Sequence, residues 1–532
     1  MQGRQAMKKE KPLTDGASKK SLPKWVLFVV IIGLLSLGVV MHKAWQKRRV
    51  AGELQSYQDV GLSATAAELE TWCPPPPPEQ NAALMLKEAA DLTVYRQKNK
   101  EIKWREKDFP NDPNLGNMFP FLDISTTRER LSARYENPVN PPADWDQKNV
   151  VLLPIYDFAR MPDVDEPIDD MTLSVMADYL NDNHQALQRL HQAVKLPKFR
   201  YLDYSQEIKS TRILMLCICI FEDMLYLETL FYAENQETDR VTQAVADSFR
   251  LANLLYQEPI ILCSRLGLSV TKIAVLNLEY ALNRCSLSRA QIQEINDIIS
   301  EIQSAPRLYR SLIGERCLSA DINYLMDGKS TYFIMHIGRT SLVSGGGGPA
   351  QFRERYFPHA DLVGVPDMDH ADYLNFMDRY IKMLDLPVEE RVQAVNEIDD
   401  EVSSIPETFP ITRLYTPRAS KLLLLDIRYQ AYLNAAQCAL LVEKYRLDNG
   451  GRLPSGLEEL VPDYVDTLPV DPYDGGYIKY KKTEDGYIVY SIGDDQKDDG
   501  GLPDPEPILG LYRPSRYKII PDADFVFTVK RK

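Results

Sequence analysis

Aspartate side chains are concentrated near the C-terminal end of the chain, where glycine-containing turns separate them. Clustered carboxylates are the ligands that calcium prefers, because the ion takes roughly six to eight hard oxygen atoms. The alternative is a solvated acidic hairpin that holds no metal, and the residue pattern leaves both interpretations open. The aspartates of this region are Asp494, Asp495, Asp498, Asp499, Asp504, Asp522 and Asp524.

Other residues that could carry chemistry are sparse. Of the six histidines, only His184 and His191 have a spacing that places them nominally on one face of a helix. As metal ligands they would need partners that the sequence does not identify, so we expect polar histidines at the surface. Asp367, Asp369 and Asp372 come at the start of an apolar helix, where aspartate caps the first turn, so we expect capping.

Catalytic motifs are missing from the sequence. It contains no zinc-protease HExxH motif, no serine-hydrolase GxSxG motif and no phosphate-binding loop. A glycine-rich dinucleotide fingerprint after a strand is also missing. Catalysis is therefore not indicated, although an enzyme site built from dispersed residues of the helical region stays open as the alternative.

The acidic residues follow a segment that predicts a long helix and a small sheet. Residues 416–448 place apolar side chains broadly on one side and end at an Asn-Gly-Gly sequence, which is typical of a helix C-cap. Tyrosine- and valine-rich stretches at 477–481, 487–491 and 525–529 predict strands, with glycine-containing turn signals bordering the first two. We therefore expect a small α+β domain with an antiparallel sheet over residues 416–532.

Several short motifs in this region resemble the globular domain of the major pseudopilin of type II secretion systems. That family has a long helix followed by a small antiparallel sheet, so the resemblance implies a pilin-like fold over about a fifth of the chain. The matching segments are residues 443–450 (EKYRLDNG) with Arg452 and Pro454, 457–461 (LEELV), 468–472 (LPVDP), 490–493 (YSIG) and 522–524 (DAD).

The resemblance also implies a calcium site. By position, its ligands are the carboxylates of Asp495, Asp522 and Asp524 and the backbone carbonyl of Ile492. The chain departs from the family in having Gln496 where the family has glycine, and in an insertion over residues 501–520. A weak calcium site would operate at the millimolar calcium found outside the cytoplasm.

The N-terminal region predicts a membrane anchor. Residues 25–41 carry no charge, and the run extends to residue 45 if the side chains of His42 and Lys43 reach the interface. It is too long for a usual signal peptide and lacks small residues at a cleavage spacing, so a signal anchor fits better than a cleaved leader. Seven lysines and arginines precede the run and four follow it, which favours a cytoplasmic N-terminus. We therefore expect a cytoplasmic basic tail at 1–24 and a transmembrane anchor at 25–45, with the bulk of the protein outside the cytoplasmic membrane.

Between the anchor and the C-terminal region, helical periodicity dominates. Residues 46–78 predict a juxtamembrane helix and a proline spacer, and 79–415 a mainly α-helical domain of helix hairpins. Ser288 and Gln291 form the sequence of a capping box. The expected fold class is therefore mainly α. The central helices are expected at 205–234, 237–256, 259–284 and 288–303.

The net charge and the order of the segments along the chain restrict the functions that we expect. Residues 50–532 carry 51 basic and 74 acidic side chains, a net charge of −23, which excludes nucleic-acid binding through bulk electrostatics. No pseudopilin processing sequence precedes the apolar run, so we do not expect a polymerising pilus subunit. The layout is similar to uncharacterised single-pass proteins of planctomycetes and related bacteria. We expect a non-enzymatic, membrane-anchored extracytoplasmic scaffold with a protein partner, linked to an envelope secretion or pilus-like machine. A third interpretation makes the pilin-like module only a structural cap on the helical domain.

Overall fold

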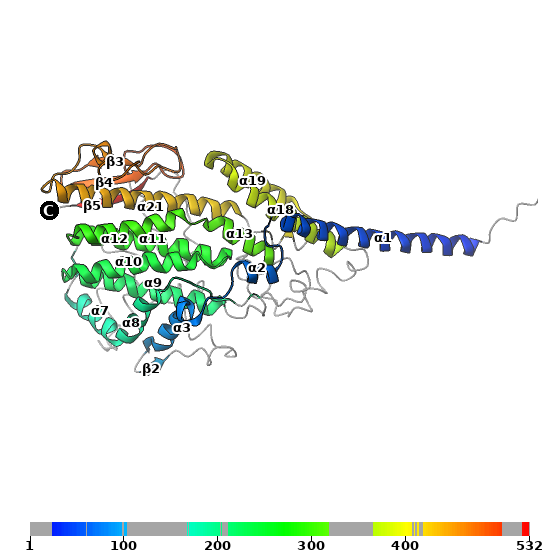
Figure 1. The fold of residues 1–532 in the computed structure, drawn as a ribbon, viewed down its shortest axis with the longest axis horizontal. Helices are drawn as coiled ribbons and strands as arrows, with labels where there is room; N and C mark the ends of the chain where they lie inside the picture. Colours follow the sequence, from blue (N-terminus) through cyan, green and yellow to red (C-terminus); the bar gives the residue numbers. More distant parts are fainter. Residues whose placement is uncertain are drawn as a thin grey trace, which may run out of the picture.

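The computed structural model describes residues 24–59, 61–97, 100–103, 167–168, 170–202, 204, 211–318, 365–406, 409, 412–413, 416, 419–502 and 524–530. Within these residues the chain is mainly helical and carries a small three-stranded antiparallel sheet. This confirms the prediction of a mainly α fold with a small antiparallel sheet. Figure 1 shows long helices side by side, with the sheet at the end of the molecule opposite the start of α1. The elements in the N-terminal part are α1 (Lys24–Asp59), α2 (Ala66–Trp72), the 3-10 helix η1 (Pro78–Gln80), α3 (Ala82–Leu92), and the hairpin of β1 (Val94–Gln97) and β2 (Lys100–Lys103).

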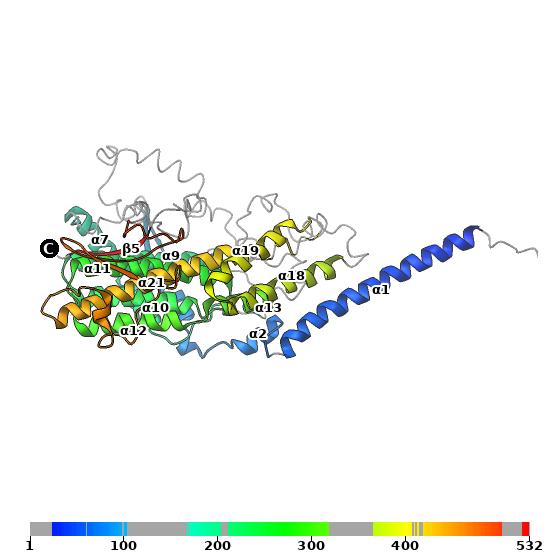
Figure 2. The same ribbon diagram turned by 90° about the horizontal axis from the view of Figure 1, so that it is seen from above.

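Helix α1 has two parts that meet different surroundings. Its N-terminal half is apolar and exposed, with Phe28, Leu34 and Leu35 more than half accessible, and Figure 2 shows it projecting away from the rest of the molecule. It is long and apolar enough to span a membrane. Helix α11 (Ile261–Arg284) also meets that criterion, but it is mostly buried inside the protein, as expected of a core helix.

The last turns of α1 dock against α18 (Val365–Lys382). The Arg49 guanidinium pairs with the Asp372 carboxylate at 3.0 Å, and the Tyr57 hydroxyl donates to the Leu374 carbonyl at 3.0 Å. The guanidinium of Arg316 lies 3.8 Å above the centre of the Tyr57 ring. The helix that carries the apolar segment is therefore part of the folded body. Asp367 lies in the first turn of α18 as expected, whereas Asp372 forms this ion pair and is not a cap.

Four antiparallel helices form the centre of the body, close to the expected positions. The predicted capping box at α12 is confirmed, because Ser288 and Gln291 each bond the backbone N–H of the other. Helix α10 packs between α9 and α11, and α12 packs on α10 and on the long helix α21. The helices of this part are α7 (Asp170–Asp182), α8 (His184–Ala193), α9 (Thr211–Glu234), α10 (Thr238–Leu255), α11, α12 (Arg289–Ser304) and α13 (Arg307–Leu318).

The C-terminal module is a long helix covered by the sheet, which agrees with the predicted helix and strands. The strand order is β3-β4-β5 with antiparallel pairing throughout, and Tyr487 of β4 lies opposite Val529 of β5. Its elements, with the helices that precede it, are α18, the 3-10 helix η5 (Met383–Asp385), α19 (Val388–Ser404), α21 (Ala419–Asp448), the 3-10 helix η6 (Leu457–Leu460), β3 (Lys479–Lys482), β4 (Gly486–Ser491) and β5 (Phe525–Lys530).

Strand β5 is fastened to α11. The backbone N–H of Thr528 donates to the Glu279 carboxylate at 2.7 Å, and the Thr528 carbonyl accepts from the Asn283 amide at 2.8 Å. The Lys530 N–H donates to the other end of the Asn283 amide at 2.7 Å. These bonds occupy the outer edge of β5, and buried apolar residues form one core that runs from α1 to this strand. The sheet therefore packs on the helical body as its cover.

Candidate functional site

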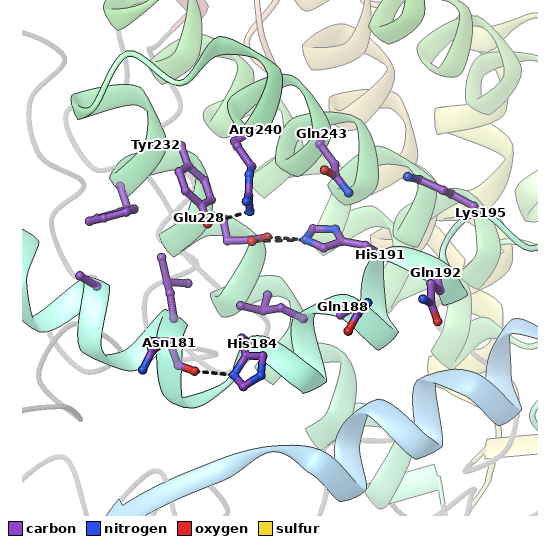
Figure 3. Close-up of a pocket in the computed structure, with 14 residues that line it drawn as sticks. Asn181, His184, Gln188, His191, Gln192, Lys195, Glu228, Tyr232, Arg240 and Gln243 are labelled. Carbon is purple, nitrogen blue, oxygen red and sulfur yellow. Dashed lines mark hydrogen bonds and ion pairs between the residues drawn. The ribbon is translucent and has the colours of Figure 1, made fainter.

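A pocket of about 550 Å³ opens on the helical body where α7, α8, α9 and α10 meet. This volume lies within the range of small-molecule sites in proteins, roughly 300–1,000 Å³. One part of its wall is apolar and contains Leu180, Leu187 and Phe231. The polar part includes His191, Glu228 and Arg240, which Figure 3 shows around the same hollow.

The position of α8 depends on a tie to the start of α3. The Asn81 side chain accepts from the N–H of Arg200 at 3.0 Å and donates to the Arg200 carbonyl at 2.9 Å. Its oxygen also accepts from the N–H of Ala83 at 3.1 Å and so caps α3. Because the chain segment after α8 is held in this way, α8 packs along α3 and presents His191 to α9 and α10.

His191 lies between two buried carboxylates from two other helices. Its Nδ1 is 2.8 Å from Oδ2 of Asp247 in α10, and its Nε2 is 3.0 and 3.2 Å from the two oxygens of Glu228 in α9. The side chains of Asp247 and Glu228 are 0% and 4% exposed, and that of His191 is 16% exposed. Figure 3 shows the imidazole and the Glu228 carboxylate facing each other.

These carboxylates set the charge of His191. Burial alone lowers the pKa of an imidazole, but the hydrogen bonds to Asp247 and Glu228 and their charges outweigh that effect and raise the pKa to about 9. At neutral pH the ring is therefore protonated, and both of its N–H groups donate to the protein itself. A histidine in this state has no free lone pair, so it is not arranged to act as a general base.

The ion pairs continue into the next helix. Asp247 Oδ1 accepts from Arg250 at 2.6 Å, and the same guanidinium reaches Glu294 of α12 at 2.6 Å. The chain of alternating charges therefore joins α8, α9, α10 and α12. Because every buried charge in it meets an opposite charge, the network can persist in a low-dielectric interior.

The expectation that His184 and His191 are both polar surface residues is wrong for His191. His184 is exposed, and its ring nitrogen lies 2.8 Å from the Asn181 carbonyl oxygen. His191 is held by partners 37 and 56 positions away, which no local pattern predicts. One feature of the sequence does indicate a buried polar contact in this part of the fold. Asp247 interrupts a stretch of α10 in which Val245, Ala246 and Phe249 are apolar and buried.

The predicted calcium ligands lie in the loops at the end of the sheet. Asp495 accepts from the N–H of Lys497 at 3.0 Å and lies 3.4 Å from its ammonium, and the N–H of Ile492 donates to Asp471 at 2.9 Å. Asp524 is buried and accepts from the N–H groups of Gly501 and Leu502 at 2.8 and 3.2 Å. Asp522 lies outside the described residues.

The carboxylate of Asp524 is only partly paired within the described residues. Its Oδ1 is buried and has no hydrogen-bond partner among the described residues, and burial raises the pKa of its carboxyl. An unpartnered carboxylate oxygen suits a hard cation such as calcium. In the part of the chain that the structure describes, however, no three acidic, histidine or cysteine side chains gather as a metal-binding group.

Two further loop carboxylates, Asp494 and Asp498, have protein partners. Asp494 pairs with Arg428 of α21 and accepts from the Tyr473 hydroxyl at 2.5 Å. Asp498 accepts from the Tyr490 hydroxyl at 3.0 Å. Of the acidic side chains in the described part of this loop, these two therefore act first as structural anchors.

No family model matches the chain, and neither does any curated protein or solved structure.

Proposed function

We propose that the protein is a membrane-anchored, non-enzymatic binding protein whose body stands outside the cytoplasmic membrane. The observation that carries this proposal is the two-part character of α1, which is apolar and exposed at one end and docked on α18 at the other. An exposed apolar helix of this length is stable in lipid and unfavourable in water. The basic residues on both sides, more numerous before the apolar run, support a cytoplasmic N-terminus.

The state of His191 favours binding over catalysis. Its two N–H groups are committed to Asp247 and Glu228, so this cluster of titratable side chains holds helices together and does not offer a base. The packing of β5 on α11 supports a covering role for the C-terminal module. The long helix α21 beneath an antiparallel sheet is consistent with the proposed pilin-like fold. We assign the exposed outer faces of the body to a protein partner in the envelope.

The anchor is tested by membrane extraction and by a topology reporter. Replacing Leu34 and Leu35 with arginine should release the chain from membranes that are washed with alkaline carbonate, because each charge at the centre of a span costs about 2.5–3.5 kcal/mol. The matched control replaces the same two residues with isoleucine and should remain in the membrane. A wild-type chain that washes off, or a C-terminal reporter active only in the cytoplasm, would overturn the proposal.

We propose further that the sheet loops bind calcium weakly through the carboxylates of Asp524, Asp495 and Asp522, with the carbonyl of Ile492. The buried, unpartnered Oδ1 of Asp524 supports this. Millimolar calcium should raise the melting temperature of the full chain in detergent more than magnesium does, and Asp524→Asn should abolish the difference. An unchanged melting temperature in calcium would contradict the site.

A further inference from the structure

Two cations at the pocket between α7, α8, α9 and α10 lack an acidic partner. Among the described residues, the side chain of Arg240 in α10 bonds only the Tyr232 hydroxyl, at 3.2 Å, and that of Lys195, just after α8, forms no ion pair. Other arginines of the same helices are paired: Arg189 with Glu88 at 2.6 Å, and Arg250 with Glu294. Unpaired cations beside a hollow are therefore a local exception in a body that is otherwise strongly acidic.

The acidic side chains at the floor of the pocket, Glu228 and Asp247, do not form ion pairs with Arg240 or Lys195. Glu228 is the acidic side chain among the described lining residues, and its carboxylate is directed to the His191 imidazolium. Asp247, behind His191, is shared with Arg250. Glu228 and Asp247 are thus each paired with a cation inside the protein, and the positive charges of Arg240 and Lys195 face solvent.

Arg240 is also held in place for a ligand. Its guanidinium lies 5.1 Å from the centre of the Tyr232 ring and bonds the hydroxyl of that ring. This contact and the hydrogen bond use one N–H group of the guanidinium, and the remaining N–H groups can donate to two oxygens of a carboxylate or phosphate. Figure 3 shows Arg240, Gln243 and Lys195 along one edge of the pocket.

We propose that this pocket binds a small organic anion, a carboxylate or phosphate monoester with a compact apolar group. The anionic group meets Arg240, with Lys195 and the Gln243 amide beside it, and the apolar group packs on Leu187 and Phe231. The recess of about 550 Å³ suits a small molecule better than an acidic protein surface. The proposal does not depend on the membrane anchor, since it concerns binding by the body alone.

The test uses the full chain in detergent and fluorine NMR of small probes. The probes are 4-fluorobenzoate and 4-fluorophenyl phosphate, each compared with neutral 4-fluorobenzamide. We expect line broadening and saturable binding for at least one anion, and at least ~10-fold weaker binding of the amide, since hydrogen bonds between charged groups carry the difference. An acidic peptide should bind no better than the small anions.

Variants assign the binding to the pocket. Arg240→Gln should weaken anion binding by about tenfold or more, whereas Arg189→Gln, on α8 but paired with Glu88, should leave it unchanged. Equal melting temperatures of the two variants show that folding is not the cause; if they differ, the Lys195→Gln variant replaces Arg240→Gln in the comparison. Equal binding of the amide and the anions, no binding of either, or equal loss in Arg240→Gln and Arg189→Gln would overturn the proposal. None of these outcomes bears on the carbonate-extraction test of the anchor.

Discussion

The pocket cluster and the sheet loops use the same residue type in opposite ways. In the loops, Asp495 and Asp498 bond groups two positions away, the N–H groups of Lys497 and Gly500, whereas Asp494 pairs with the distant Arg428 of α21. At the pocket, Asp247 and Glu228 meet His191 from 56 and 37 positions away. Asp495 and Asp498 therefore shape turns, whereas the pocket carboxylates Asp247 and Glu228 join separate helices. We therefore expect the dense cluster of aspartates in the loops to contribute less to the free energy of unfolding than the two carboxylates at the pocket.

The largest expected effect is that of removing the central pocket carboxylate. Asp247→Ala leaves the buried charges of His191 and Arg250 with one fewer partner, and breaking a buried ion pair costs about 3–5 kcal/mol. Asp495→Ala, the matched change in the loops, should cost at most about 1 kcal/mol. Urea unfolding of the full chain, followed by circular dichroism, gives both values. Equal losses would remove the distinction between the two regions.

The pH dependence of stability should come next in size. The folded-state pKa of His191 is about 9, against about 6.5 for an unperturbed histidine, so its contribution is complete below pH 6.5. It is lost as the pH rises toward 9, and the total is about 3 kcal/mol at 1.36 kcal/mol per pKa unit.

The variant His191→Gln isolates this contribution. The difference in unfolding free energy between wild type and variant should shrink steadily between pH 6.5 and 9. A difference that stays constant across this range would mean that His191 is not protonated in the folded protein.

A smaller effect is expected at Asp471, the buried carboxylate of the sheet module. It accepts from the Ser491 hydroxyl at 2.8 Å and from the N–H groups of Ile492 and Tyr473 at 2.9 and 3.1 Å. Asp471→Asn retains the shape but loses the charge and should cost about 1–3 kcal/mol. The exposed Asp466→Asn serves as control and should be neutral in thermal unfolding. A loss as large as that of Asp247→Ala would show that local motifs can match the pocket cluster in energy.

Features encoded by neighbouring residues were predictable from the sequence. The capping box at Ser288 and Gln291, the long helix α21 and the three strands follow from caps, periodicity and turn residues, which act over a few positions. The apolar character of α1 is likewise a property of one segment.

Features that depend on distant partners were not predictable. The imidazolium of His191 results from the packing of three helices, and Asp372 meets Arg49 across 323 positions. The sequence contains both partners but not the distance between them. A carboxylate within an apolar helical face, as at Asp247, signals that a partner exists without identifying it.

Because α1 docks on α18, no flexible linker separates its apolar segment from the body. Because α1 runs without a break from Lys24 to Asp59 and Arg49 and Tyr57 fasten its end, any tilt or rotation of the helix is transmitted to the whole molecule. A thinner bilayer increases the tilt of a long apolar helix. Under the proposed anchoring, the sheet, which lies farthest from the start of α1, would move through the widest arc, and bilayer thickness would affect the height and direction of this distal end.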